Sequence, residues 1–217
     1  MKCARAFRST RLVYGSAEAS SMRREITVKQ CSIIYAAVDA VVNASNPDAV
    51  LGGGVSRALF DECGGDVLQR EMREKLDADF EGKLGADDCL VTSAGTSTRL
   101  RFVLHVASVD YRSMRVSEDG RMQASSAERV ASGAEAAMRA AAELAHQHGP
   151  LSVAFPLLGS GSGHLAPAAS LKAIIDGMRR VFRDEPDAPV TRVVFAVPEP
   201  ETYELAKRRL DQLLVLR

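Results

Sequence analysis

The sequence predicts a three-layer α/β/α sandwich in which a mixed, largely parallel sheet lies between helices. Predicted strands alternate with predicted helices along the chain, which is the pattern of parallel α/β folds. Continuous apolar β-branched runs such as residues 40–43 are typical of strands that are covered on both faces. The alanine-rich segment 126–148 places small apolar residues on one helical face, which favours close packing on a sheet.

The strands are predicted from short apolar, β-branched runs between turn residues. They cover Ile26–Gln30, Ser32–Ile34, Ala40–Asn43, Cys89–Thr92, Arg101–Ala107, Ser152–Phe155 and Arg192–Val197. The helices are predicted from apolar residues at helical spacing, and Gly64-Gly65 and Gly149-Pro150 supply stop signals. They cover Gly52–Cys63, Asp66–Lys75, Ser126–His148, Ala168–Phe182 and Glu199–Leu214.

The segment Ser108–Ser125 is polar and charged with little periodicity, so we predict a surface loop there. Loops of this length are uncommon unless they are mobile or functional.

Composition indicates one domain, predicted over residues 24–217 of the 217. The 28 basic residues balance the 28 acidic ones, so no global field favours a nucleic-acid backbone and no sequence-specific nucleic-acid partner is expected. The apolar runs are far shorter than the ~20 residues that cross a bilayer, so no membrane contact is expected. The four cysteines form no Cys-x-x-Cys pair, which argues against zinc and disulfides and suits a cytoplasmic protein. We expect no cofactor and no metal.

The first 23 residues are rich in arginine and serine and lack an apolar core, which excludes a secretory signal. Transit peptides share this composition, but we interpret the segment as a disordered leader or as an upstream start, with Met22 as the true initiator.

Two glycine-rich segments follow predicted strands. Asn43 ends the strand at 40–43 and Asn46 follows three residues later; Leu51-Gly52-Gly53-Gly54-Val55 then opens a helix whose free N–H groups can face an anion. The second segment, Gly159-Ser160-Gly161-Ser162-Gly163, can turn several N–H groups inward as a nest. Neither segment fits a dinucleotide fingerprint or a P-loop.

These two segments, in this order, resemble the signatures of macro domains, and the resemblance covers roughly residue 24 to the C-terminus. Members of that family bind ADP-ribose, and some hydrolyse its linkages. The resemblance implies that both glycine segments wrap the pyrophosphate and that Asn46 hydrogen-bonds the distal ribose. An amide suits a sugar because it donates to one hydroxyl and accepts from its neighbour. The alternative for Asn46 is a turn residue before Pro47.

Several hydrolytic members carry an acid immediately after Gly-Gly-Gly-Val, and this chain has Ser56 there. A serine does not replace a carboxylate base at neutral pH. Asp48 lies nearby as a substitute base, but its Asn-Pro-Asp context favours a turn residue. We also predict that Asn43 holds local backbone and that His105 is a core histidine.

Adenine recognition also departs from the family pattern. Members usually read the exocyclic amine with an aspartate after the first strand, and the matching residue here is Ser32. The stacking aromatic after the penultimate strand is missing, so Ile33 and Val197 are predicted to pack near the base. Where members often have an aromatic side chain that covers the distal ribose, this chain has His164.

Binding of ADP-ribose or of ADP-ribosylated protein is therefore the primary hypothesis, with Asn46 as the one candidate catalytic residue. The rival is an ADP-ribosyl hydrolase or O-acetyl-ADP-ribose deacetylase in which Asn46 positions water and a substrate phosphate acts as base. A third alternative is a degenerate domain kept for protein contacts. The predicted ligand site consists of Ser32, Ile33, Asn46, Gly52, Gly53, Gly54, Val55, Ser56, Gly159, Ser160, Gly161, Ser162, Gly163, His164 and Val197.

Overall fold

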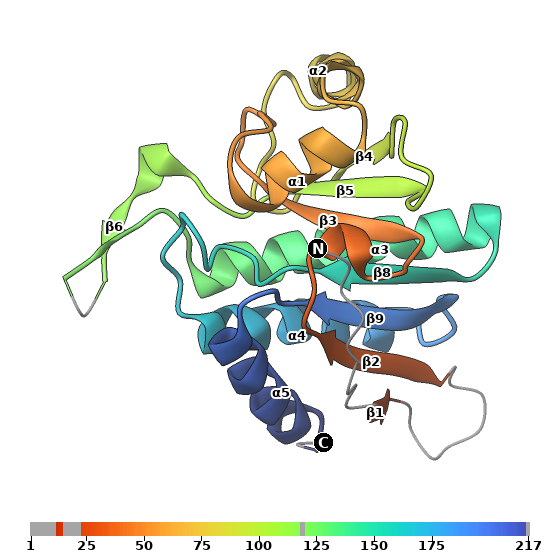
Figure 1. Cartoon of the computed structure of the whole chain (residues 1–217), viewed down its shortest axis with the longest axis vertical. Helices are drawn as coiled ribbons and strands as arrows, with labels where there is room; N and C mark the ends of the chain where they lie inside the picture. Colours follow the sequence, from red (N-terminus) through yellow and green to blue (C-terminus); the bar gives the residue numbers. More distant parts are fainter. Residues whose placement is uncertain (1–11, 15–22, 118–119, 216–217) are drawn as a thin grey trace.

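The computed structural model describes residues 12–14, 23–117 and 120–215. A seven-stranded sheet runs through it in the order β1-β2-β9-β8-β3-β5-β4 (Figure 1). Adjacent pairs among the five central strands are parallel, while β1 and β4 are antiparallel edges. The strands are β1 (Leu12–Tyr14), β2 (Arg24–Lys29), β3 (Ala40–Ser45), β4 (Leu90–Ser93), β5 (Phe102–Ala107), β8 (Leu151–Phe155) and β9 (Val190–Ala196).

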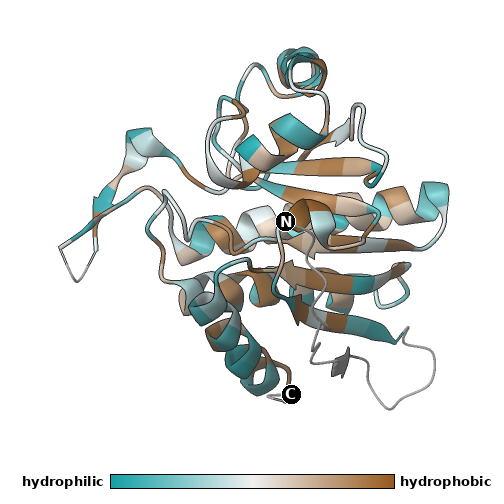
Figure 2. Cartoon of the chain, in the orientation of Figure 1, coloured by the Kyte–Doolittle hydropathy of each residue, from teal (hydrophilic) through white to brown (hydrophobic). Residues whose placement is uncertain are grey.

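Helices cover both faces of the sheet, which confirms the predicted three-layer sandwich. On one face, α1 (Gly54–Glu62) packs on β3 and α2 (Asp66–Asp79) packs on β4. On the other face, α3 (Ala127–His148), α4 (Pro167–Asp184) and α5 (Pro200–Val215) share one apolar core with the sheet. The apolar strands run between these two layers (Figure 2).

Strand residues alternate between the two cores, as the two-residue period of a strand requires. In β9, Val193 and Phe195 belong to the α3–α5 core, whereas Val194 and Ala196 belong to the α1–α2 core. Because both faces are covered, these strands read as unbroken apolar runs in the sequence.

The predicted strand at Ser32–Ile34 is wrong. That segment forms a 3-10 turn, η1 (Ile33–Tyr35), in which the Tyr35 amide donates to the Ser32 carbonyl at 2.9 Å. A short apolar run does not distinguish a strand from a helical turn, and β2 has already ended at Lys29.

The segment 108–125 is more ordered than the predicted loop. It contains a 3-10 turn, η2 (Tyr111–Ser113), and a small hairpin of β6 (Arg115–Val116) and β7 (Met122–Gln123). We call residues 110–117 and 120–124 the arm. It projects from the sandwich on the left of Figure 1.

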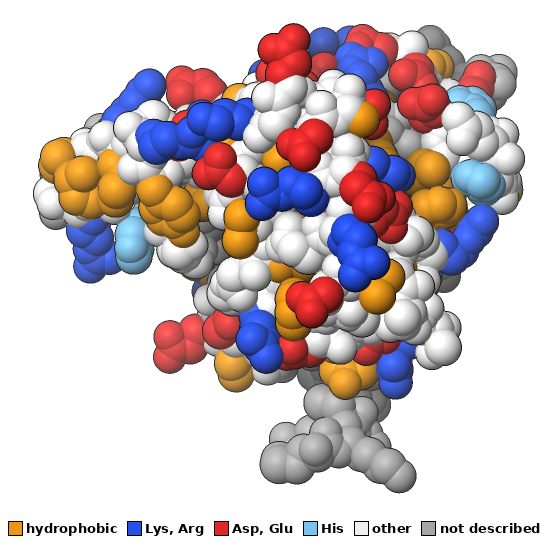
Figure 3. Space-filling view, turned by 90° about the horizontal axis from the view of Figure 1, so that it is seen from above, with side chains coloured by type: hydrophobic (Ala, Val, Ile, Leu, Met, Phe, Trp, Pro, Cys, Tyr) orange, Lys and Arg blue, Asp and Glu red, His pale blue; other side chains and the backbone are white. Residues whose placement is uncertain are grey.

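The arm exposes apolar side chains, including Met114, Val116 and Met122. Hydrophobic side chains, in orange, gather at the left of Figure 3, on the side where the arm projects.

Of the proposed leader, residues 12–14 and 23 are described, and Leu12–Tyr14 pairs with β2; the rest lies outside the described residues. No helix in the described ranges is long and apolar enough to cross a membrane.

Candidate functional site

A cleft of about 750 Å³ opens at the carboxyl edge of the sheet. Its walls come from the segments that follow all five parallel strands, because parallel strands end at the same edge. The predicted residues Ser32, Ile33, Asn46, Ser56 and Val197 all line it, and so do both glycine segments, Gly52–Gly54 with Val55 and Gly159–Gly163.

His164 is the one predicted site residue that does not line the cleft. It is exposed, and its backbone adopts a φ of 57°. Its carbonyl accepts from the Gln123 side chain at 3.1 Å, which ties it to the arm. The sequence places His164 directly after the glycine run, but the turn there directs the chain away.

The first glycine segment presents backbone donors to the cleft. The N–H groups of Gly54, Val55 and Ser56 open α1, so they have no partner within the helix. A Cβ built on Gly52 or Gly53 would meet no atom within 4 Å, which shows that both positions face open space. Among the described residues these N–H groups have no other acceptor, so the start of α1 forms one wall of the cleft with free donors and a favourable helix dipole.

The second glycine segment has a fixed shape with an open tip. A Cβ on Gly159 would lie 2.2 Å from the Ser125 hydroxyl, and one on Gly163 would lie 2.5 Å from the Gly159 carbonyl. Gly161 at the tip has no neighbour within 4 Å. Within the described residues, the N–H groups of residues 161–163 donate to no protein acceptor. Glycine is thus required at the base of this loop, while its tip offers free donors.

Asn46 is a turn residue that also lines the cleft. Its Oδ1 accepts from the amides of Asp48 at 3.1 Å and Val50 at 3.5 Å, which makes it a turn residue. Its Nδ2 has no protein partner in the described ranges, and the residue lines the cleft. An amide donor at the end of β3 therefore remains for a ligand.

Ser56 belongs to a buried hydrogen-bond chain. Its hydroxyl donates to Asn43 Oδ1 at 2.9 Å, and Asn43 Nδ2 donates to His105 Nδ1 at 3.0 Å. His105 Nε2 must then carry the proton and donate to Thr92 Oγ1, 2.9 Å away. Asn43 thus fixes side chains rather than local backbone.

His105 is fully buried, which confirms a core histidine. Burial lowers its pKa to about 3, while Glu71 raises the pKa slightly and Lys75 lowers it. In the described part of the chain, the Ser56 hydroxyl donates to Asn43 Oδ1 and the Ala44 carbonyl, and neither group is a base at neutral pH.

Replacing Ser56 by alanine is expected to cost about 1 to 3 kcal/mol of unfolding free energy, because Asn43 Oδ1 would be left buried without a donor. Denaturant unfolding measures this loss. Ligand affinity should change much less than stability, and a stable but ligand-blind variant would show that the hydroxyl itself contacts ligand.

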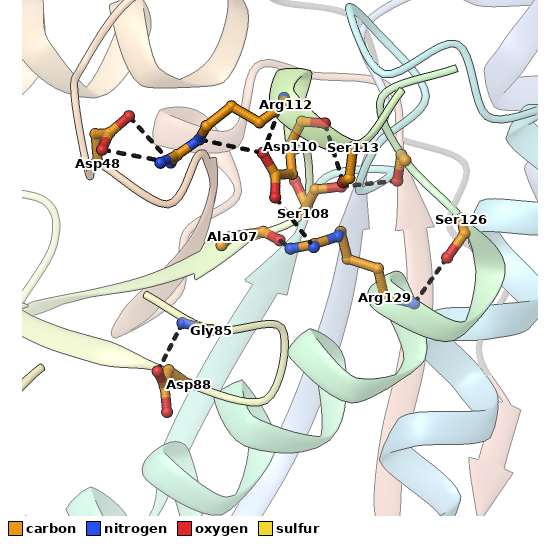
Figure 4. Close-up of polar contacts among 11 residues, drawn as sticks. Asp48, Gly85, Asp88, Ala107, Ser108, Asp110, Arg112, Ser113, Ser126 and Arg129 are labelled. Atoms are coloured by element: carbon orange, nitrogen blue, oxygen red, sulfur yellow. Dashed lines mark hydrogen bonds and ion pairs between the residues drawn. The ribbon is translucent and has the colours of Figure 1, made fainter. Parts of the chain in front are cut away.

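Asp48 is paired with Arg112 outside the cleft. Arg112 Nη2 approaches Asp48 Oδ2 at 3.3 Å, and Arg112 also pairs with Asp110 (Figure 4). Asp110 in turn meets Arg129 Nη2 at 3.5 Å, and Arg129 donates to the Ala107 carbonyl at 3.1 Å. Asp48 does not line the cleft, so these contacts make it a link between the Asn46 turn and the arm.

Sequence reasoning missed Tyr111, which lines the cleft from the arm. Its hydroxyl donates to Ser162 Oγ at 2.7 Å and so joins the arm to the second glycine segment. Asp110 orients this turn by accepting from the Arg112 amide at 3.1 Å. An aromatic soon after a central strand was the available signal, but nothing in the sequence indicates that the loop brings Tyr111 to the cleft.

Replacing Tyr111 by phenylalanine is expected to speed ligand release about three- to tenfold, because the loss of a neutral hydrogen bond costs about 0.5 to 1.5 kcal/mol. Stopped-flow dissociation measures the rate. Ser162→Ala should give the same change, and the double variant should add nothing further. Additive effects of the two substitutions would contradict the contact.

Sheet order, layers and the cleft at the carboxyl edge define an α/β sandwich with a mixed, largely parallel sheet, in which this edge is the usual place for a ligand. A family model described as Macro domain matches residues 42–174, and the chain belongs to the macro domain family.

A macro domain-containing protein of Listeria monocytogenes is 26% identical over 191 residues, which cover 88% of this chain and 99% of that protein. An O-acetyl-ADP-ribose deacetylase of Enterobacter cloacae is 26% identical over 193 residues, covering 88% and 96%. The Oceanobacillus iheyensis macrodomain solved with ADP superposes with a TM-score of 0.72 at 15% identity, covering 96% and 98% of the two chains.

Proposed function

We propose that this chain is a reader-type macro domain that binds ADP-ribose or ADP-ribosylated groups. The observation that carries the proposal is the convergence of two sets of unpaired backbone N–H groups on one cleft. They come from the start of α1 and from residues 161–163. Gly54, Gly161 and Ser162 are exposed, so water can satisfy their N–H groups in the free chain, and a ligand rich in acceptors can replace that water at several donors at once.

A diphosphate satisfies these donors. Its oxygens accept several N–H bonds at once, and the helix dipole at Gly54 favours negative charge. Asn46 Nδ2, at the end of β3, is placed for the hydroxyls of a sugar beyond the diphosphate. The cleft of about 750 Å³ lies within the ~300–1,000 Å³ that is usual for small-molecule sites.

Relatives support the same ligand class. The Oceanobacillus iheyensis structure contains ADP, and the Enterobacter cloacae relative is named for O-acetyl-ADP-ribose.

Hydrolysis is the second candidate, favoured by the deacetylase relative. Water would be positioned by Asn46, and a phosphate oxygen of the substrate would accept its proton. The cleft lining contains no aspartate or histidine within the described residues, and its one glutamate, Glu199, follows β9 rather than β3. Loss of a general base typically costs about 10² to 10⁴ in rate, which is why binding is placed first.

Incubation with O-acetyl-ADP-ribose and with a mono-ADP-ribosylated protein separates the two candidates. If the chain is a reader, both linkages should break only at their slow spontaneous rate, and adding the protein should not increase the release. Release that depends on the protein and falls with Asn46→Ala would establish the hydrolase instead. Asn46→Asp is the matched variant, since it keeps the turn acceptor but removes the free N–H donor.

A further inference from the structure

Among the described residues that line the cleft, Glu199 carries the single charged side chain. It is exposed, and within the described part of the chain its carboxylate forms no ion pair or side-chain hydrogen bond. Every other residue of the lining is apolar, a glycine, or a neutral hydroxyl or amide residue. Glu199 directly precedes the first residue of α5, where the helix dipole favours an acid, and phosphate binding does not explain its place in the cleft.

Strand register places this acid beside Ser32. β2 and β9 pair in parallel with Lys29 opposite Ala196, and the Val197 amide donates to the Lys29 carbonyl at 2.9 Å. Ser32 and Glu199 each lie three residues beyond that pair, and both line the cleft. They therefore occupy the same end of the cleft, on adjacent strand ends.

This end is separated from the sugar end of the cleft. β9 lies two strands from β3 in the sheet, which corresponds to about 10 Å at the usual strand spacing. Ile33 and Val197, both buried, supply an apolar surface next to Ser32 and Glu199. An apolar platform with a carboxylate at its rim suits a flat heterocycle that carries hydrogen-bond donors.

We propose that Glu199 gives the cleft its preference for a base with an exocyclic amine, a role that the serine at position 32 does not supply. The proposal rests on the binding of ADP-ribose proposed above. The carboxylate accepts from the amine of adenine, and charged acceptors form stronger hydrogen bonds than a serine hydroxyl. Against hypoxanthine, which has a carbonyl oxygen at that position, the same carboxylate is repulsive.

The test compares ADP-ribose with its hypoxanthine analogue, inosine diphosphate ribose, by calorimetric titration of the full chain. We expect the native chain to prefer ADP-ribose about tenfold or more, equivalent to about 1.4 kcal/mol. Glu199→Gln should reduce the preference to about twofold or reverse it, because an amide can also donate to the carbonyl.

Glu201→Gln is the matched control. Glu201 lies in the first turn of α5 and gains the same kind of helix-dipole stabilisation, but it does not line the cleft. The Glu201→Gln variant should prefer ADP-ribose over inosine diphosphate ribose as strongly as the native chain does. Thermal melts of both variants verify that each is folded.

Two failures are distinguishable. An unchanged preference in Glu199→Gln, with ADP-ribose still bound, overturns the role of Glu199 and leaves the proposed function intact. Absence of binding by the native chain to either nucleotide overturns the proposed function itself. An equal loss of preference in Glu201→Gln also overturns the specific role, since it assigns the effect to the charge of the helix end.

Discussion

Replacing Gly161 by glutamate is expected to abolish ADP-ribose binding without unfolding the chain. The structure leaves open space around Gly161, and its φ lies outside the left-handed region, so a side chain is accommodated. The new carboxylate then stands among the N–H groups of residues 161–163 and repels a diphosphate. Affinity should fall from the micromolar range to beyond millimolar, a loss of about 4 kcal/mol or more.

A series at the same position separates bulk from charge. Gly161→Ala should bind nearly as well as the native chain, Gly161→Gln should bind more weakly, and Gly161→Glu should not bind. Circular dichroism and thermal melting verify that all three remain folded. If the glutamate variant binds normally, the second glycine segment does not hold the phosphates.

The unfolding free energy is expected to fall as the pH drops below about 6.5, because His105 is neutral and buried in the folded chain. Burial lowers its folded pKa to about 3 from the ordinary 6.5, so in this range the unfolded chain binds a proton that the folded chain excludes. The stability is fully present above pH 6.5 and is lost toward pH 3, by up to about 1.4 kcal/mol per pH unit.

Two carboxylates, Glu71 and Glu135, affect the unfolding free energy at lower pH. Burial raises the pKa of Glu71 and of Glu135, but hydrogen bonds from Ser93 and Lys75, and from Arg139 and Arg180, outweigh it and lower both values below 4.5. Their stabilisation is lost below about pH 4.5.

Urea unfolding between pH 4.5 and 6.5 therefore isolates His105. His105→Gln should be less stable overall, but its unfolding free energy should change less steeply with pH, by the equivalent of about one proton. If the unfolding free energies of the two proteins change equally with pH, a group other than His105 takes up the proton.

Much of the site could be predicted from the sequence because its chemistry is carried by backbone. Two glycine segments that each follow an apolar strand favour anion binding over ordinary turns, and the strand pattern predicts that Gly52–Gly54 and Gly159–Gly163 lie at one edge of the sheet, where both line the cleft. Asn46 followed from its position at the end of β3. These are local sequence patterns, so these site residues could be predicted without knowledge of tertiary packing.

Other features depend on tertiary contacts that leave no local pattern. Tyr111 reaches the cleft because the arm folds back, held by the Asp110 amide on the Ala124 carbonyl at 2.7 Å and by the Ala124 amide on the Gly163 carbonyl at 3.2 Å. Glu199 enters through the register of β2 on β9, which the sequence does not specify. The Ser56–Asn43–His105 chain likewise joins residues up to 62 positions apart.

Calorimetric titration of the full chain with ADP-ribose, with AMP and ADP as reference ligands, tests the central claim most directly. We expect a dissociation constant in the micromolar range, about −8 kcal/mol, with weaker binding of AMP, which lacks the diphosphate. No detectable heat up to millimolar ADP-ribose would contradict the claim. The macro fold would then serve another ligand or a protein contact.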